Sequence, residues 1–178
     1  LSTDIGPVID QEAKQNLENH KANMRKVARA YVELEAPTNG HFVAPAVYLL
    51  DNLNQLQREV FGPILHIVRY KKENLVNVLN EVNAKGYALT GGCHSRIRKQ
   101  MDLVEKHLHC GNFYINRNIV GAVVGVQPFG GHGLSGTGPK AGGEFYLQRL
   151  TKTDRYYSQF GDENTLGNAQ PVLDSITG

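Results

Sequence analysis

A glycine-rich segment, residues 121–143, is the part of the chain where chemistry is easiest to recognise. Glycine loses so much backbone entropy on folding that such a run disfavours a helix or a regular strand. The segment also contains Val123, Val124, Val126 and Phe129, which make it too apolar for a disordered linker. The sequence therefore predicts an ordered loop whose bare backbone closely approaches another group, most often a ligand.

Two nucleotide-binding patterns occur in this loop, and both are incomplete. Gly131–Gly136 matches G-x-G-x-x-G, and Asp154 follows at about the distance of a ribose-binding acid. That fingerprint requires a helix to begin at the third glycine, whereas Thr-Gly-Pro-Lys-Ala-Gly-Gly follows here. A phosphate-binding loop is also disfavoured, because Gly133–Gly138 is followed by Pro139 and Lys140 instead of Lys-Ser or Lys-Thr.

Each of the two cysteines is a candidate nucleophile, because each has a histidine beside it: Cys93 precedes His94, and Cys110 follows His109. Adjacent residues of a strand point to opposite faces, so His94 cannot readily activate Cys93. Buried structural thiols are the better interpretation, and so few cysteines suit a reducing compartment. The seven histidines lack the spacing of metal ligands, so we expect no metal site.

Glu59 is a candidate binding residue at the entry to a predicted strand, where Val-Phe-Gly-Pro follows it. It is either a solvated acid before a turn, or a carboxylate that accepts hydrogen bonds from two sugar hydroxyls beside an aromatic face. The spacing alone leaves both interpretations open.

The bulk properties are those of an ordinary globular chain. Its 178 residues carry a net charge of +2, with 40% hydrophobic and 20% charged residues. The basic residues are scattered among acids, so we expect no nucleic-acid binding. The longest apolar run, Phe42 to Leu50, is too short to span a bilayer, so we expect no membrane binding. Because the chain opens on Leu1 with no apparent lead-in, we expect it to be a piece of a longer protein.

Helices and strands are predicted to alternate along the chain. Asp10 is expected to cap a helix that runs to about Leu34. Strands are expected at His41–Leu50, Ile64–Tyr70 (buried), Tyr87–His94 and Gly111–Asn116, and helices at Glu73–Ala84 and Arg96–His107. Lys85-Gly86 is expected to stop the first of these helices. This alternation predicts an α/β fold, a three-layer αβα domain with a mostly parallel sheet. The glycine loop follows the last strand, at the sheet edge where such folds bind ligands.

The segments after the loop are expected to be simpler. A short helix is predicted at Gly143–Leu150, and Lys152–Phe160 is strand-like without an obvious partner in the chain. The polar, turn-rich end is expected to be a flexible tail. The chain is therefore divided into a domain at residues 1–150, a C-terminal strand at 151–160 and a tail at 161–178.

Several motifs together resemble the aldehyde dehydrogenase superfamily, in order and in spacing: Glu59-Val-Phe-Gly-Pro63, Gly111–Asn116 and Pro128–Gly136, with Asp4–Ile9 similar to the segment after the family's nucleophile. Residues 116–129 and 135–143 are more closely similar to the pyrroline-5-carboxylate (glutamate-semialdehyde) dehydrogenase module of bacterial proline utilization A. The resemblance covers roughly residues 1–158 and implies the catalytic-domain fold of that family.

The resemblance implies a role for five residues. Glu59 would bind the hydroxyls of the nicotinamide ribose of NAD, and Phe61 would pack against the nicotinamide end. Gly121 and Ala122 would offer backbone N–H groups to the substrate's carboxylate, and Phe129 would pack on its aliphatic chain. Backbone amides that converge on a carboxylate need small residues, and such charge-assisted hydrogen bonds are strong.

The implied reaction is the NAD-dependent oxidation of glutamate semialdehyde to glutamate in proline catabolism, in the bacterial cytoplasm. The family's nucleophilic cysteine, general-base glutamate, oxyanion asparagine and Rossmann domain lie upstream of the motif at Asp4. Neither Cys93 nor Cys110 occupies the nucleophile's motif, so we expect no catalytic residue here and neither turnover nor appreciable NAD binding by this chain alone. FAD is expected only in a separate proline dehydrogenase domain.

The implied partners are the remainder of the parent polypeptide and an aldehyde substrate that bears a carboxylate. The strand at 151–160 would pair with a flap of another subunit and so form a homo-oligomer. Three alternatives stay open: a dehydrogenase for another aldehyde, a non-catalytic assembly module, and a nucleotide-binding module. The last is the weakest, because the loop supplies one cation, Lys140.

Overall fold

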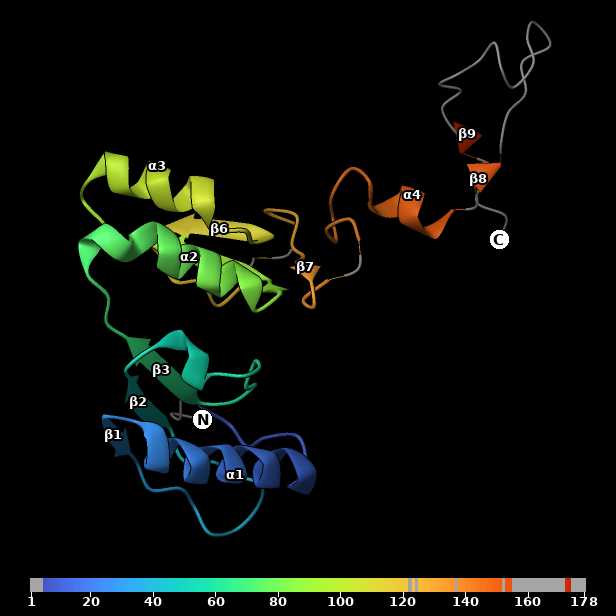
Figure 1. Ribbon diagram of the computed structural model, residues 1–178. Helices are drawn as coiled ribbons and strands as arrows, with labels where there is room; N and C mark the ends of the chain where they lie inside the picture. The colour runs from blue at the N-terminus through green and yellow to red at the C-terminus, as the bar shows by residue number, and fades with distance from the viewer. Residues whose placement is uncertain are drawn as a thin grey trace, which may run out of the picture. The chain divides into compact units, whose positions relative to one another are not determined.

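The computed structural model describes residues 5–121, 123, 125–136, 138–151, 153–154 and 172–173. The chain has an α/β fold and divides into two compact units, residues 1–85 and 86–178 (Figure 1). The helices of the described part are α1 (Gln11–Val27), α2 (Leu75–Ala84), α3 (Arg98–His107) and α4 (Tyr146–Leu150), with short 3-10 helices η1 (Leu53–Gln55) and η2 (Lys72–Asn74). The strands are β1 (Ala30–Glu33), β2 (Ala46–Leu50), β3 (Ile64–Val68), β4 (Tyr87–Ala88), β5 (Thr90–Cys93), β6 (Asn112–Ile115), β7 (His132–Gly133), β8 (Thr153–Asp154) and β9 (Val172–Leu173).

The first unit is a three-stranded sheet with α1 along one face (Figure 1). Strand β2 lies in the middle, antiparallel to β1 and parallel to β3. The core forms between α1 and the sheet, where Met24 packs with Ala46, Tyr48 and Leu50. Tyr48 is fully buried at 0% exposure, so this helix–sheet contact is the core of the unit.

Helix α1 begins as predicted but ends earlier. The Asp10 side chain accepts a hydrogen bond from the Ala13 N–H at 2.7 Å, which caps the helix. The helix ends at Val27 and the backbone is already extended at Ala28, so the prediction of a helix to about Leu34 is wrong. Residues 30–33 instead pair with β2, and these sheet hydrogen bonds override the helical pattern.

The strands of the first unit also differ from expectation. The strand predicted at residues 41–50 is present only after Pro45, which agrees with the effect expected of proline. Strand β3 was expected to be buried, yet Leu65 and Ile67 are 57% and 40% exposed. They point to the opposite face from Ile64 and Val68, which pack on the core that α1 covers.

In the second unit, β5 pairs in parallel with β6, and α3 packs against β5. The strand expected at Tyr87–His94 is two strands interrupted at Leu89, because β4 pairs separately with β7 of the glycine-rich loop. Helix α2 ends before Gly86, which has a positive φ of 80°, as the predicted glycine stop requires. The described strands of both units thus pair in parallel and antiparallel fashion, in separate small sheets.

The C-terminal segments are described in part. The short helix predicted at Gly143–Leu150 is present as α4. Of the strand expected at Lys152–Phe160, the structure describes Thr153–Asp154, which pairs antiparallel with Val172–Leu173. The expectation that this strand has no partner within the chain is therefore wrong for these two residues. The rest of it, and most of the tail, lie outside the described residues.

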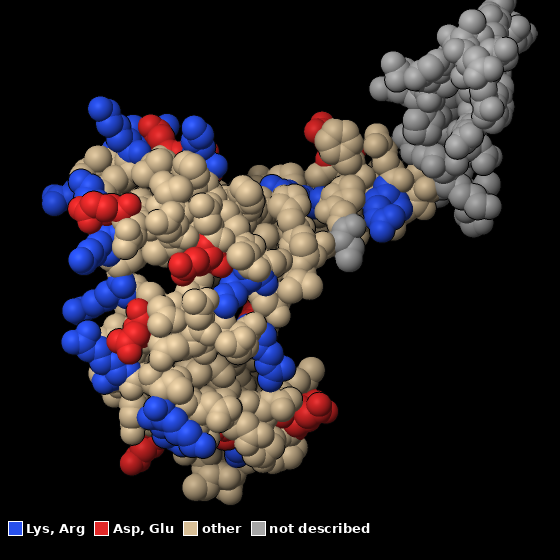
Figure 2. All heavy atoms as spheres, viewed as in Figure 1, with Lys and Arg blue, Asp and Glu red and all other residues tan. Residues whose placement is uncertain are grey.

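Acidic and basic side chains are mixed over the face of each unit seen in Figure 2, in agreement with the scattered charges of the sequence. Among the described residues, no helix combines the length and apolar character that crossing a membrane requires.

Candidate functional site

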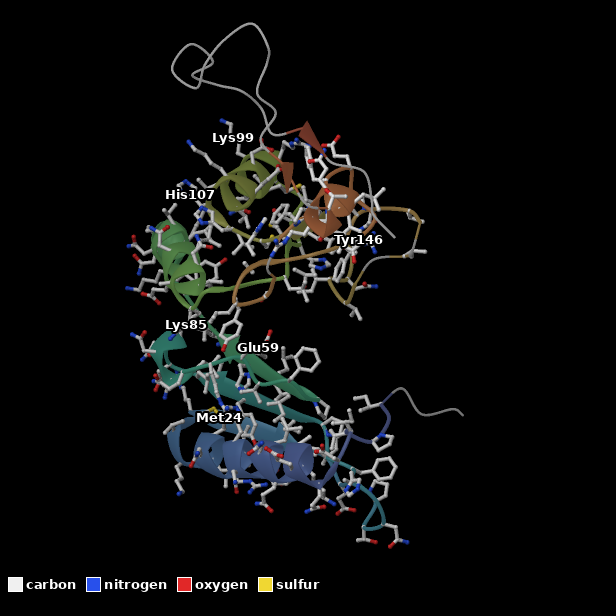
Figure 3. The ribbon with its side chains drawn as sticks, turned by 90° about the vertical axis from the view of Figure 1, so that its right-hand side faces the viewer. Met24, Glu59, Lys85, Lys99, His107 and Tyr146 are labelled. Atoms are coloured by element: carbon white, nitrogen blue, oxygen red, sulfur yellow. The ribbon has the colours of Figure 1, made fainter. Side chains whose placement is uncertain are left out.

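The predicted site residues belong to the two different units. Glu59 and Phe61 lie in the first unit, between η1 and β3 (Figure 3). Gly121 and Phe129 lie in the second, on the loop that follows β6. Ala122 lies outside the described residues. Each unit therefore presents its own group of candidate residues, and we describe each group by itself.

Both candidate side chains of the first unit are accessible. Phe61 is 85% exposed, and Glu59 is exposed and forms no ion pair with a described residue. An exposed carboxylate can accept hydroxyl hydrogen bonds, and an exposed aromatic ring two residues away offers a flat apolar surface. The geometry of this unit is thus compatible with the functional interpretation of Glu59.

The segment that carries Glu59 packs against α1 through Gly62. A Cβ atom built on Gly62 would lie 2.6 Å from both Leu17 methyl carbons, and Leu17 is buried at 4% exposure. The Ala46 N–H also donates to the Pro63 carbonyl at 3.0 Å, which ties the segment to β2. A side chain at position 62 would therefore displace the buried Leu17 side chain, which glycine avoids.

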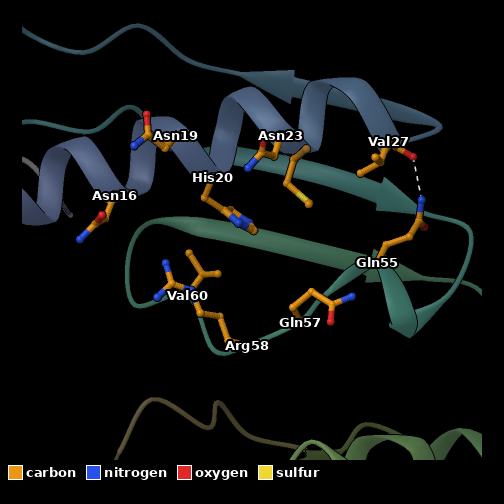
Figure 4. A pocket seen from close by; sticks show the side chains of 10 residues that line it. Asn16, Asn19, His20, Asn23, Val27, Gln55, Gln57, Arg58 and Val60 are labelled. Atoms are coloured by element: carbon orange, nitrogen blue, oxygen red, sulfur yellow. Dashed lines mark hydrogen bonds between the residues drawn. The ribbon is translucent and has the colours of Figure 1, made fainter.

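Arg58 and Val60, on either side of Glu59, line an open pocket of about 520 Å³ next to α1 (Figure 4). Much of its polar lining is carboxamide, and part of that already serves the fold. The Gln55 amide donates to the Val27 carbonyl at 2.8 Å, and its oxygen accepts from the Asp51 N–H at 2.8 Å. These bonds join η1 to the end of α1, so Gln55 is a structural residue.

At this pocket, His20 of α1 meets His66 of β3, with 2.9 Å between their Nε2 atoms. Burial lowers the pKa of His66 to about 4, and burial and the nearby Arg58 lower the pKa of His20. Both rings are therefore neutral near pH 7, and one donates its Nε2 proton to the other. The described residues contain no group of three or more metal-ligating side chains, so we assign this pair to the joining of α1 and β3.

A second cluster of titratable side chains in this unit joins α1 to strands β1 and β2. The Arg25 guanidinium donates to Glu33 at 2.6 and 2.8 Å, and the Tyr48 hydroxyl donates to the same carboxylate. Buried Lys21 lies 3.4 Å from Glu33. The Arg25 hydrogen bond lowers the pKa of Glu33 to about 2, and burial raises the pKa of Tyr48. Sequence reasoning missed this cluster, because residues 21, 25, 33 and 48 come together only through the packing of α1 on the sheet.

In the second unit, side chains of β6 and its end anchor the loop that carries Gly121 and Phe129. The buried Asn112 amide donates to the Pro128 carbonyl at 2.9 Å, and its oxygen accepts from the Gly130 N–H at 3.2 Å. Asn116 has a positive φ of 55°, where the chain leaves β6, and exchanges two hydrogen bonds with the Ser95 backbone at 2.9 and 3.0 Å. Two asparagines thus fix both ends of the loop.

Gly121 and Phe129 differ in how firmly they are held. A Cβ atom built on Gly121 would meet no atom within 4 Å, so space is open on that side of the backbone. Phe129 is half-buried, and its backbone exchanges hydrogen bonds with Ala141 at 3.1 and 3.0 Å. Open space beside a small residue is what a ligand-binding backbone needs.

Two other glycines of this unit, Gly136 and Gly111, are needed because the chain packs closely against its own backbone there. A Cβ atom on Gly136 would collide with the Gly131 carbonyl, and one on Gly111 would collide with the Gly130 carbonyl. The predicted close approach of bare backbone is present at these positions, but the partner is the chain's own backbone. Gly121, Gly125 and Gly142, by contrast, face open space, so the ligand interpretation keeps structural support at Gly121.

The structure also removes competing chemistries. No helix follows Gly136 among residues 138–145, and α4 begins at Tyr146, so the dinucleotide fingerprint fails. Cys93 and Cys110 are free and half-buried. The Cys110 thiol lies 3.5 Å from the Asn112 carbonyl, and burial raises its pKa. This environment favours the protonated thiol and supports the structural interpretation, although Cys110 is half-buried and not buried as expected.

With this geometry in place, comparison with known proteins is informative. The aldehyde dehydrogenase family model matches residues 1–155. The bifunctional protein PutA of Rhizobium meliloti is 52% identical over 176 residues, which cover 97% of this chain and 14% of that protein. A 1-pyrroline-5-carboxylate dehydrogenase of Geobacillus sp. (strain WCH70) is 38% identical over 149 residues, 82% of this chain and 28% of that protein.

Solved structures agree with these sequence matches. A variant of Bradyrhizobium japonicum proline utilization A superposes with a TM-score of 0.79 at 55% identity, over 83% of this chain and 15% of that one. A 1-pyrroline-5-carboxylate dehydrogenase from Thermus with bound NAD superposes with a TM-score of 0.73 at 36% identity, over 82% of this chain and 28% of that one. The chain therefore spans only a small part of the relatives that it matches.

Proposed function

Because the chain belongs to the aldehyde dehydrogenase family, we propose that it is part of an NAD-dependent 1-pyrroline-5-carboxylate dehydrogenase. The parent enzyme would oxidise L-glutamate 5-semialdehyde to glutamate in proline catabolism. One observation carries this proposal: the chain matches both bifunctional PutA and the stand-alone dehydrogenases. The activity that we propose for the parent enzyme is the one that the name of the second kind of relative states.

We further propose that the complete domain has three αβα layers with a mostly parallel sheet. The described strands include the parallel pairs β2–β3 and β5–β6, with α1 and α3 packed against these sheets. A β–α–β crossover of this kind adds strands in parallel, so further parallel strands from the parent chain would extend these short sheets. Leu65 and Ile67, exposed on the face of the first sheet opposite the core, are the kind of surface that a further layer covers.

In the first unit, we propose that Glu59 accepts hydrogen bonds from the nicotinamide ribose hydroxyls and that Phe61 packs at the nicotinamide end. NAD would supply the hydride-accepting ring, and this chain would orient it. The support is the exposed carboxylate without an ion-pair partner among the described residues, the 85% exposed ring and the packing of the neighbouring Gly62 on α1.

In the second unit, we propose that Gly121 and Ala122 offer backbone N–H groups to the substrate's carboxylate and that Phe129 packs on its aliphatic chain. The support is the open space at Gly121 and the anchoring of the loop ends by Asn112 and Asn116. Backbone amides bind an anion without placing a fixed charge in the site. Such a loop would select aldehydes that carry a carboxylate at the far end.

We propose that the isolated chain has no turnover. The described structure offers no activated nucleophile, because the Cys110 thiol is protonated and hydrogen-bonded, and Cys93 is a half-buried residue of β5. Other parts of the parent protein would supply the nucleophile, the general base and the Rossmann domain. FAD would belong to a separate proline dehydrogenase domain, and residues 151–160 would pair with another subunit of a cytoplasmic homo-oligomer. The family resemblance of that segment supports the last point.

One comparison tests the proposal. The parent enzyme and the isolated chain are assayed for NADH formation with glutamate semialdehyde, and the parent is assayed again as Glu59→Gln. We expect turnover by the parent, none by the chain, and a KM for NAD roughly tenfold higher in the variant, as for the loss of a charged hydrogen bond. Glu35→Gln, on another exposed acid, is the matched control. Turnover by the chain alone, or a parent enzyme that prefers another aldehyde, would refute the proposal.

A further inference from the structure

Tyr114 is a buried residue of β6, and its side chain contacts the loop that follows this strand. It lies two residues after Asn112, so both side chains project from the same face of the strand. Tyr114 is 6% exposed and Asn112 is 9% exposed. Since Asn112 already holds the end of the loop at Pro128 and Gly130, this face of β6 is the support on which the loop lies.

Three points of the loop converge on the Tyr114 side chain. The Gln127 amide donates to the Tyr114 hydroxyl oxygen at 2.7 Å. The same oxygen lies 3.5 Å from the Gly121 carbonyl oxygen. The Arg117 guanidinium lies over the ring, 4.6 Å from its centroid. Residues at the start, in the middle and near the end of the loop (Arg117, Gly121 and Gln127) therefore all contact one aromatic side chain.

The direction of these contacts matters. Because Gln127 donates to the hydroxyl oxygen, the hydroxyl proton is left to point at the Gly121 carbonyl. The distance of 3.5 Å makes this a long, weak contact, and closing it would need only a small movement of the loop. A hydroxyl proton directed at this carbonyl ties the backbone of the loop at Gly121 to the side chain of Tyr114.

We propose that Tyr114 and Gln127 are positioning residues that hold the loop in the shape that binds the substrate's carboxylate. The inference rests on the proposed function of Gly121 and adds to it a cause of substrate selectivity. Neither side chain needs to touch the substrate. Their role is to orient backbone amides before the substrate arrives, so that binding requires little further ordering. The residues thereby set the preference for aldehydes with a distal carboxylate.

The test uses the full-length parent enzyme as wild type, Tyr114→Phe, Gln127→Met and the double variant. Each is assayed with glutamate semialdehyde and with pentanal, which has the same chain length but lacks the carboxylate and the amino group. Tyr114→Phe removes only the hydroxyl, and Gln127→Met keeps an unbranched side chain of similar length. Tyr87→Phe is the control, since Tyr87 is a half-buried tyrosine of the same unit whose hydroxyl makes no hydrogen bond to a described residue.

We expect each single variant to lower kcat/KM for glutamate semialdehyde roughly tenfold, mostly through KM, because one oriented hydrogen bond is lost. The values for pentanal and the KM for NAD should not change. The double variant should lose little more than either single one, because both residues act through the same bond. Tyr87→Phe should behave as wild type.

The outcomes separate this inference from the one it rests on. If the wild type does not prefer glutamate semialdehyde to pentanal, the carboxylate-binding role of Gly121 is wrong, and the positioning role falls with it. If the wild type discriminates but the variants keep that preference, or lose activity equally on both substrates, Tyr114 and Gln127 are merely structural. Gln127→Met keeps the test valid if Tyr114→Phe fails to fold.

Discussion

Leu17 and Gly62 lie in direct contact, because a Cβ atom at position 62 would lie 2.6 Å from both Leu17 methyl carbons. This contact joins α1 to the segment that carries Glu59 three residues earlier. Neither Leu17, which is 4% exposed, nor the segment, which is tied to β2 through Pro63, can give way without disturbing the core. The position of Glu59 is thus set by helix packing as much as by its own neighbours.

We expect Gly62→Ala to damage stability and cofactor binding together. Forcing one methyl group into this contact should lower the free energy of unfolding by about 1–3 kcal/mol, as overpacking does. Displacement of the Glu59 segment should also raise the KM of the parent enzyme for NAD. Urea unfolding and steady-state kinetics measure the two effects. Gly6→Ala is the control, since a Cβ atom on Gly6 meets no atom within 4 Å. Equal behaviour of the two variants would contradict the contact.

The His20–His66 pair predicts a pH dependence of stability. Burial lowers the pKa of both rings in the folded state, to about 4 for His66, from the ordinary value of 6.5. Between these pH values the unfolded chain binds more protons than the folded chain, so acid favours unfolding. We expect the free energy of unfolding to be largest above about pH 6.5 and to fall as the pH decreases toward about 4.

Urea unfolding of wild type and His66→Gln over this pH range measures the effect. The variant should be less stable at pH 7, because the imidazole contact is lost, but its stability should depend less on pH. His94→Gln, on an exposed histidine of the second unit, is the control and should keep the wild-type slope. A His66→Gln slope equal to that of wild type would mean that the pair does not control the response.

Glu33→Gln tests the charge cluster that joins α1 to strands β1 and β2. The substitution removes the carboxylate from Lys21, which is 3% exposed, and from Arg25 and Tyr48. Lys21 would keep only Glu18, 3.5 Å away, as an acidic partner. Removal of one partner from a buried charge is strongly destabilising, so we expect a loss of about 3 kcal/mol in the free energy of unfolding at pH 7. Asp102→Asn, which breaks the exposed Arg98–Asp102 pair, should change stability by less than about 1 kcal/mol. Similar losses in both variants would show that burial of Lys21 does not matter.

The contribution of Glu33 also has its own pH window. Because the pKa of Glu33 falls to about 2 in the folded state from the ordinary 4.5, its stabilisation is present above about pH 4.5 and is lost between there and about pH 2. This window lies below that of the histidine pair. Wild type should therefore lose stability in two successive ranges of pH, and Glu33→Gln should flatten only the lower one.

Local signals predicted the parts of the fold that neighbouring residues determine. The Asp10 cap and the Gly86 stop of α2 depend on side-chain and backbone chemistry within one helical turn, and both are present. The end of α1 depends on the pairing of residues 30–33 with β2, far along the chain, and the prediction was wrong. Leu65 looked like a core residue because its apolar character does not say which face of the sheet is covered.

The candidate site divides in the same way. The glycine-rich loop and the Glu59 motif were found from residue types in sequence order, and the structure leaves Glu59 exposed and Gly121 beside open space. The role of Tyr114 could not be found in this way, because its partner Gln127 lies 13 residues later and the contact depends on how the loop folds back. The need for glycine at positions 111 and 136, which pack on the chain's own backbone, likewise depends on three-dimensional contacts.

Cys93 and Cys110 are the two cysteines of the chain and its candidate nucleophiles, so substituting them tests whether this chain supplies the nucleophile. Cys110 is held by the Asn112 carbonyl, and its pKa is raised by burial, so its thiolate population at neutral pH is small. We expect Cys110→Ser and Cys93→Ser, each made in the parent enzyme, to keep kcat within about twofold of wild type, since loss of a true nucleophile removes orders of magnitude. Thermal unfolding should report a modest loss for Cys110→Ser, whose hydroxyl is more polar than the half-buried thiol that it replaces. A variant that folds with the stability of wild type yet loses all turnover would place the nucleophile within this chain and overturn the division of labour proposed for the parent enzyme.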